Sequence, residues 1–468
     1  MLDEADREVM RALARYIQHA NDLTAAEQRS AVTPVGERVA EHLGVDPTAL
    51  PVVSETFADH RLVDADLALE ELAHGSGSAL LGIGGGEQRF HSAMPELLAN
   101  AGMRWALGPV TYTARATGPH GSRQTVSFGL RLLVFEGDPL AVVQRSAKPN
   151  YGRNAAELEV MGADPERVMR FLERVRALMV ERSVLRGQVL SLERSQYGAE
   201  AGATFLARPT VRAEEIVLGE GVLDRVVEHV VGIGEQSGVL SAAGQHLKRG
   251  VLLYGPPGTG KTLTVRHLLS RTPGVTAVVL TGASIAAIGV AAELARTFQP
   301  SIVVLEDIDL VAMERHTSPQ PLLFEVLDAL DGLDGDADVA FVMTTNRVEV
   351  LERALADRPG RVDLAVEIAL PGDEERVRLF RRYGDGLPFS ADAIERAARA
   401  AGGTTGSFAK ELMRRSVLAA AVRGEQPGDA DLATALDDLL SQREALTRTL
   451  LGVSTGDGTG LDDHEGTP

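Results

Sequence analysis

The chain has 468 residues, more than a single hydrophobic core usually organises, so two or three domains are expected. Hydrophobic residues make up 44% of the chain and charged residues 24%, which is typical of a folded globular protein. The net charge of −19 argues against a general nucleic-acid-binding protein, and the absence of cysteine excludes disulfides and thiolate metal sites.

The N-terminal sequence MLDEADREVMRALARY is acidic and has apolar residues at helical spacing, unlike a signal peptide. No apolar run approaches the ~20 residues that a membrane-spanning helix needs. These features predict a cytoplasmic protein without a membrane span.

The first half of the chain divides into three predicted parts. Residues 1–50 are expected to form a helical segment. Residues 51–150 predict an α+β domain, which includes two strands around the turn Gly137-Asp138-Pro139. Residues 151–212 predict a connector of short strands and one helix that begins at Asp164-Pro165.

Strand and helix patterns alternate over residues 213–372, which predicts a mostly parallel sheet. Residues 373–450 are helical in pattern. The tail, residues 451–468, is rich in Gly, Thr and Asp and is expected to be disordered.

The stretch GPPGTGKT at residues 255–262 fits the phosphate-binding motif G-x-x-x-x-G-K-[ST] without a mismatch. An apolar strand, VLLY, precedes it and a helical stretch, TLTVRHLLS, follows it. Glycines let such a loop curl so that backbone N–H groups point at phosphate oxygens. The predicted nucleotide-binding residues are Gly255, Pro256, Pro257, Gly258, Thr259, Gly260, Lys261, Thr262 and Leu263.

A second motif, IVVLEDID, ends an apolar strand in Glu306 and Asp307, with Asp309 two residues further on. It lies one strand–helix unit after the loop, where a strand that positions Mg²⁺ is expected. We assign the metal to Glu306 and the Thr262 hydroxyl, and the polarisation of the attacking water to Asp307.

The motifs GPPGTGKT, LEDID, TTN (344–346) and DRPGRVD (357–363), in this order and spacing, resemble those of the AAA ATPases. The resemblance covers about 213–448. It implies an α/β fold in which a P-loop parallel sheet has helices on both faces and an α-helical lid. Here this module follows the α+β N-terminal domain.

By the same resemblance, Asn346 helps to orient the lytic water. Arg358 and Arg361 correspond to arginine fingers, which reach into the ATP site of a neighbouring subunit. Within the lid, Gly406 or Ala409 is expected near the sugar of the nucleotide.

The sequence departs from the family pattern in places. The usual acid order is Asp-Glu, whereas this chain has Glu306-Asp307, an order similar to that of the mitochondrial translocase of the Rieske protein. The loop expected to face a central pore offers only Ile285 and Ile288, where many threading unfoldases have an aromatic residue. No HExxH motif follows the module, so a built-in metalloprotease is not expected.

The sequence therefore predicts an ATP- and Mg²⁺-dependent ATPase that forms a homo-oligomer, usually a hexamer in this family, and acts on an unidentified protein client. One alternative is a nucleic-acid motor or loader, which the acidic composition disfavours. Another is a scaffold switched by ATP with little hydrolysis, which the reversed acid order keeps open. His60, His74 and His91 lack metal-ligand spacing, so they are assigned to the surface or the polar core.

Overall fold

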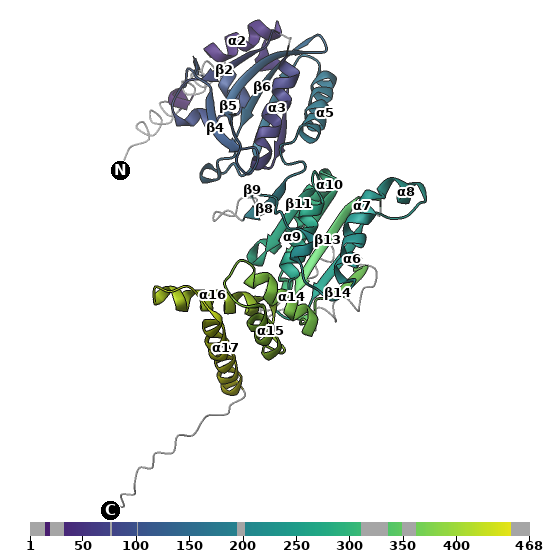
Figure 1. Ribbon diagram of the computed structural model, residues 1–468. Helices are drawn as coiled ribbons and strands as arrows, with labels where there is room; N and C mark the ends of the chain where they lie inside the picture. The colour runs from purple at the N-terminus through teal and green to yellow at the C-terminus, as the bar shows by residue number, and fades with distance from the viewer. Residues whose placement is uncertain are drawn as a thin grey trace, which may run out of the picture.

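The computed structural model describes residues 15–18, 32–74, 77–100, 102–193, 202–309, 336–348 and 362–450. These residues form two seven-stranded sheets, each with its own core, followed by a helical subdomain (Figure 1). Within these ranges, no helix combines the length and apolar character needed to cross a membrane.

The first sheet is antiparallel throughout, with the strand order β1-β7-β6-β5-β2-β3 and with β4 paired to β5. Its strands are β1 (Val52–Phe57), β2 (Ala79–Ile83), β3 (Leu107–Gly108), β4 (Thr111–Ala116), β5 (Ser122–Phe135), β6 (Asp138–Arg145) and β7 (Ala156–Gly162). Its helices are α2 (Pro34–Leu43), α3 (Leu62–Ala73), α4 (Met94–Leu98) and α5 (Pro165–Glu181).

Helices cover both faces of the first sheet. The apolar sides of α3 and α5 pack on one face, against Leu140 and Val142 of β6. Those of α2 and α4 pack on the other, against Ala141 and Val143. Successive residues of β6 are thus buried on opposite faces, because side chains alternate along a strand.

The predicted hairpin and helix start are both present in this domain, but the hairpin turn lies one residue earlier than predicted, so that Asp138 and Pro139 begin β6. Glu136 and Gly137 join β5 to β6 with positive φ angles of 51° and 94°, as a two-residue hairpin turn requires. The Asp164 carboxylate accepts a hydrogen bond of 2.9 Å from the amide of Glu166, and Pro165 occupies the first turn of α5.

The second sheet has the strand order β14-β10-β13-β12-β11-β8-β9 and is parallel except for the β8–β9 pair. Its strands are β8 (Val189–Glu193), β9 (Gly202–Leu206), β10 (Arg249–Tyr254), β11 (Thr276–Thr281), β12 (Ser301–Glu306), β13 (Val339–Thr345) and β14 (Leu364–Glu367). Its helices are α6 (Val222–Val227), α7 (Ile233–Glu235), α8 (Ser237–Ala242), α9 (Lys261–Arg271) and α10 (Ile288–Thr297).

Helices also cover both faces of the second sheet, as predicted. Helix α10 packs on one face through Ile288 and Leu294. Helices α6 and α9 pack on the other through Val226, Val265 and Leu268. The α/β fold class with a P-loop parallel sheet is therefore confirmed.

We expected residues 151–212 to be a connector, and the described residues of this range (151–193 and 202–212) have no core of their own. Strand β7 pairs within the first sheet, and helix α5 packs on one face of that sheet. Strands β8 and β9 extend the second sheet beyond β11. Val189 and Leu190 of β8 point into the cores on opposite faces of the second sheet. The hairpin is thus a structural part of the parallel sheet.

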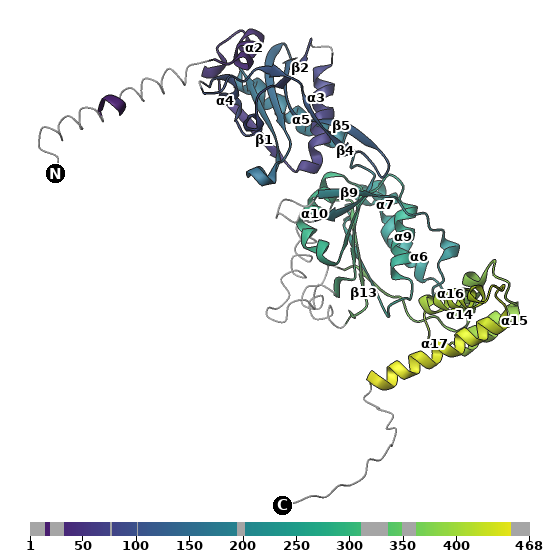
Figure 2. The ribbon, with the colours of Figure 1, turned by 90° about the vertical axis from the view of Figure 1, so that its left-hand side faces the viewer.

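Four helices follow the second sheet and correspond to the predicted lid: α14 (Asp373–Gly384), α15 (Ala391–Ala400), α16 (Gly406–Val422) and α17 (Asp429–Leu450). Their core includes Phe380, Leu412 and Leu432. These helices lie at the end of the second sheet away from the first domain (Figure 2).

The two sheets meet at the chain segment that follows α5. Buried Asp64 of α3 accepts hydrogen bonds from the Ser183 hydroxyl (2.8 Å) and the Val184 amide (3.0 Å). The Arg61 guanidinium lies 5.5 Å from the centre of the Phe298 ring, which belongs to the core of the second sheet. Hydrogen bonds to Asp64 therefore hold the chain in place where it leaves the first domain.

Candidate functional site

The phosphate-binding motif connects β10 to α9 at the carboxyl edge of the second sheet. Gly255, Gly258 and Gly260 have φ angles of 140°, 78° and 117°, which side-chain-bearing residues rarely adopt. A Cβ on Gly255 would lie 2.3 Å from the carbonyl oxygen of Ile368. Glycine is therefore required both for the curl of the loop and for its approach to the chain after β14.

Lys261 begins α9, and its side chain folds back into this loop. It is only 6% exposed, and Nζ donates hydrogen bonds to the carbonyl oxygens of Gly255 (2.7 Å) and Pro256 (2.8 Å). Burial lowers the pKa of Lys261, while the nearby carboxylates of Asp307 and Asp309 act in the opposite direction. The loop thus holds an ammonium group at its centre.

Glu306 ends β12 beside the start of α9. Burial raises the pKa of the Glu306 carboxyl, and a hydrogen bond with the Thr262 side chain opposes that rise. The structure therefore brings together the two residues predicted to hold a metal ion.

Asp307 follows directly and has a φ angle of 53°, a left-handed conformation that is uncommon for residues other than glycine. Its amide donates to the Thr344 hydroxyl (3.0 Å), and its Oδ1 accepts from Asn346 Nδ2 (3.0 Å). The structure thus brings together the residue predicted to polarise the attacking water, Asp307, and the residue predicted to orient it, Asn346.

Asp309 has a place in this network that our sequence analysis did not assign. It is 3% exposed, and Oδ1 accepts hydrogen bonds from the Thr345 hydroxyl (2.9 Å) and from the amide of Asn346 (3.1 Å). It therefore fixes the backbone from which the Asn346 side chain extends. Two features of the sequence could have indicated this role: Asp309 is a third acid just past a buried strand, and the TTN segment offers two threonine hydroxyls at the end of another strand.

A cavity of about 150 Å³ adjoins the phosphate-binding loop at Thr259. Leu218 and Ile368 line it from the second sheet's domain, and Leu379 lines it from α14 of the lid. The lid also contacts the loop directly, since the amide of Ser407 donates to the carbonyl oxygen of Gly258 (3.4 Å). A partly apolar cavity thus lies beside the phosphate-binding loop.

Gly406 and Ala409 of the lid have different environments. A Cβ on Gly406 would lie 3.6 Å from the carbonyl oxygen of Gly258, whereas Ala409 is fully buried in the lid core. Of the two candidates for the nucleotide's sugar, Gly406 is the residue beside the loop.

The expected pore residues are not available to a client. Ile285 and Ile288 are 1% and 2% exposed and pack in the core of the second sheet, so the expectation that their side chains face a pore is wrong. Arg358 and Arg361, the predicted arginine fingers, lie outside the residues that the structure describes.

Comparison with known proteins gives the same assignment for the second domain. Residues 251–370 match the family described as "ATPase family associated with various cellular activities (AAA)". The ATP-dependent zinc metalloprotease FtsH of Slackia heliotrinireducens is 31% identical over 273 residues, covering 54% of this chain and 34% of that protein. The 26S proteasome regulatory subunit S10B homolog B of Arabidopsis thaliana is 38% identical over 154 residues, covering 30% of this chain and 38% of that protein. The chain thus spans less than half the length of these relatives.

We predict that Asp309→Ala increases hydrogen exchange at the amide of Asn346, because this half-buried amide and the buried Thr345 hydroxyl lose their acceptor. The local stability should fall by about 1–3 kcal/mol, the cost of unsatisfied buried donors. Asp309→Asn keeps an oxygen in place and should retain most of the protection. Amide exchange measured at Asn346 tests this, and equal protection in both variants would contradict it.

Proposed function

Since residues 251–370 form an AAA domain, we propose that the protein hydrolyses ATP and uses the energy in a ring-shaped assembly to remodel or move protein clients. One observation carries the proposal. Lys261, the Thr262–Glu306 pair and the Asp307–Asn346 pair lie together at the carboxyl edge of the parallel sheet. The residues proposed for phosphate binding, metal binding and water activation therefore form a single site.

In this proposal the loop of residues 255–260 holds the phosphates of ATP with its backbone N–H groups. The Lys261 ammonium exchanges its two carbonyl acceptors for β- and γ-phosphate oxygens. The cavity beside Thr259 accommodates the base between Leu218 and Leu379 of the lid. Closing the lid would therefore complete the nucleotide site.

The residues present suit Mg²⁺. Among the described residues, no group of three or more His, Cys, Asp or Glu side chains is placed to hold a metal ion. Mg²⁺ in nucleotide sites typically uses one or two protein oxygens, with phosphates and water completing its shell. Glu306 and the Thr262 hydroxyl supply oxygens of that kind. The bound ion would neutralise charge on the phosphates.

The remaining residues act on water. We assign the general base to Asp307, which would accept a proton from the water that attacks the γ-phosphate. Asn346 donates to Asp307 Oδ1, so it fixes the direction of that carboxylate and of the water it binds. Asp309 holds Asn346 in this position through its backbone amide.

The assembly and its client belong to the same proposal. Arg358 and Arg361 would serve the site of a neighbouring subunit in a homo-oligomer, and a hexamer is the form we propose. The similar proteins are named as a zinc metalloprotease and a proteasome regulatory subunit, which supports protein clients. The net charge of −19 supports clients other than nucleic acid. We propose a cytoplasmic location.

The acid order favours a second candidate, a scaffold that ATP switches without rapid hydrolysis. Asp307 is one methylene shorter than the glutamate usual at this position, and its carboxylate is engaged by Asn346. A steady-state rate of phosphate release, compared with the oligomer size in ATP and in ADP, separates the two functions. Slow release with ATP-dependent assembly would favour the scaffold.

Lys261→Ala should abolish ATP binding, because the phosphate cradle loses its charged ligand. Lys410→Ala, an exposed lysine on α16, is the matched control and should bind ATP as the wild type does. Calorimetric titration with ATP and Mg²⁺ measures both. Wild-type affinity in Lys261→Ala would show that the phosphates bind elsewhere.

Glu306→Gln and Asp307→Asn should fail in different ways. Glu306→Gln removes charge beside the metal, so Mg²⁺-dependent ATP binding should weaken. Asp307→Asn keeps the metal site but loses the base, so hydrolysis should fall by ~10²–10⁴ while ATP stays bound. The ratio of bound ATP to bound ADP in each purified variant tests this, and the reverse pattern would exchange the two roles.

Arg358→Ala and Arg361→Ala should leave ATP binding largely intact and lower hydrolysis, because an arginine finger acts on charge in the transition state. Such fingers contribute roughly 10³–10⁵ in rate. Mixing either variant with Asp307→Asn should restore part of the activity if the site is shared between subunits. The absence of rescue at every mixing ratio would contradict a finger acting on its neighbour.

A further inference from the structure

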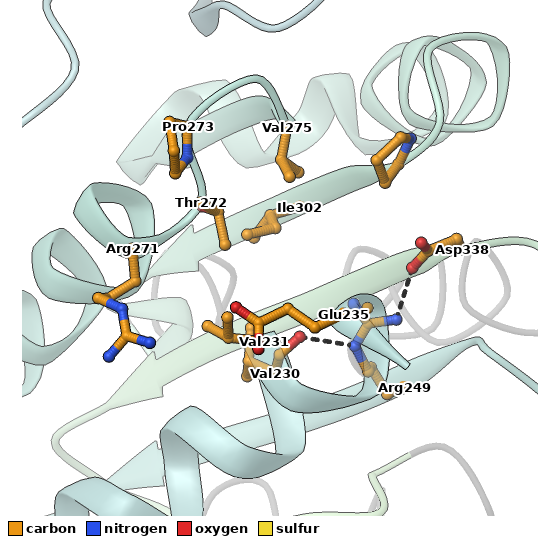
Figure 3. A pocket seen from close by; sticks show the side chains of 12 residues that line it. Val230, Val231, Glu235, Arg249, Arg271, Thr272, Pro273, Val275, Ile302 and Asp338 are labelled. Carbon is orange, nitrogen blue, oxygen red and sulfur yellow. Dashed lines mark hydrogen bonds and ion pairs between the residues drawn. The ribbon is translucent and has the colours of Figure 1, made fainter. Parts of the chain in front are cut away.

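A cavity of about 330 Å³ lies at the amino edge of the second sheet, opposite the phosphate-binding loop (Figure 3). Arg249 at the start of β10, Ile302 near the start of β12 and Asp338 just before β13 line it. Thr272, which follows the last residue of α9, also lines it. Its volume is within the range of pockets that bind small molecules.

The walls of this cavity are mainly aliphatic. Val231 and Val275 lie on opposite sides of Ile302, as Figure 3 shows, and two prolines complete the wall. Aromatic rings are absent from the lining residues. The space therefore suits a compact apolar group better than a flat ring system that needs stacking.

Arg249 forms an ion pair with Asp338 at one end of the cavity. It is 5% exposed, and its guanidinium donates to Asp338 Oδ1 (2.8 Å) and to the carbonyl oxygen of Val230 (3.0 Å). A Cβ on Gly234 would lie 2.9 Å from Nη2 of Arg249, so glycine leaves room for the guanidinium. Since Asp338 balances its charge, this pair adds polarity without a net charge.

Two further charged residues line the cavity without a neutralising partner. Arg271 and Glu235 are exposed, and neither forms an ion pair with any residue in the described part of the chain. In Figure 3 the Glu235 side chain extends along the apolar wall near Val231, and Arg271 lies at the end away from Asp338. The cavity thus offers one cationic and one anionic group around an aliphatic space.

We propose that this cavity binds a small zwitterion of the apolar amino-acid class. The compact aliphatic side chain of the ligand would contact Val231, Val275 and Ile302. Its carboxylate would pair with Arg271, and its ammonium group with Glu235. A ligand with only one of these charges would leave the other protein group unpaired, which is why the zwitterion is favoured.

The cavity shares its elements with the phosphate site. Helix α9 has Lys261 at its start and ends at Arg271, while β12 and β13 lead to Glu306 and Asn346. Arg208 reinforces the connection, since its guanidinium donates to the carbonyl oxygens of Thr272 (3.0 Å) and Val275 (2.6 Å). A ligand that shifts the end of α9 would therefore also change ATP affinity, and the effect is reciprocal. This coupling rests on the proposed ATP site, whereas the binding itself does not.

Calorimetric titration of the full chain, without nucleotide, tests the binding. The probes are L-leucine and L-phenylalanine, with 4-methylpentanoate and isopentylamine as leucine analogues that each lack one charge. L-Leucine should bind more tightly than L-phenylalanine, and each analogue of leucine should bind at least tenfold more weakly than leucine itself. The absence of heat for L-leucine up to millimolar concentrations, or tighter binding of L-phenylalanine than of L-leucine, would overturn the proposal.

Substitutions identify the site. Arg271→Gln and Glu235→Gln should each weaken amino-acid binding at least tenfold. Arg296→Gln, an exposed arginine in the last turn of α10, is the matched control and should leave binding unchanged. Equal affinity in Arg271→Gln, Glu235→Gln and the wild type would overturn the assignment. An ATP affinity that the bound amino acid does not change would overturn the coupling.

Discussion

The parallel pairing of β10, β12 and β13 is the constraint on which the candidate ATP site depends. Tyr254 lies opposite Thr345, and Leu305 lies opposite Met343, so the three strands end at one edge of the sheet. Each strand is followed by a functional residue, and none of these residues could meet the others in an antiparallel arrangement. Two threonine hydroxyls and the buried Asp309 then fix how the chain leaves this edge.

The first domain obtains its order by different means. Its antiparallel sheet contains buried ion pairs, such as that of Arg145 with Glu159. The Glu159 carboxylate also accepts a hydrogen bond of 2.9 Å from the amide of Met94. A buried pair of this kind adds little net stability, but losing one partner would leave a charge without compensation. The carboxylate of Glu159 thus specifies how α4 meets the sheet.

The parts of the site that were predictable from sequence are those encoded in short segments. The glycines of residues 255–262 indicate the conformation of the phosphate-binding loop. The contact between Asp307 and Asn346 follows from the order of strands in the family. The pairing of β8 with β11 was not predictable in the same way, because the paired residues Leu190 and Val278 are far apart in the chain. Local patterns indicate a strand but carry no information about its neighbour.

The errors have a similar origin. Ile285 and Ile288 were interpreted as pore residues from their position in a loop, but the helical turn Gly282–Ala287 directs Ile285 into the core. Asp309 was noticed without a role, because its partners Thr345 and Asn346 come from the next strand. The cavity beside Arg249 could likewise not be predicted, since its lining residues come from five separate parts of the chain.

The position of β8 has a mechanical consequence. The first domain leads into β8 through Gly187, whose amide donates to the Thr276 hydroxyl at the start of β11. A pull from the first domain would load the hydrogen bonds between β8 and β11 along the strand direction, so that they resist together in shear. A strand peeled from its end breaks its bonds one after another and yields to a smaller force. The hairpin thus allows tension on the N-terminal domain to be transmitted to the sheet that carries the ATP site.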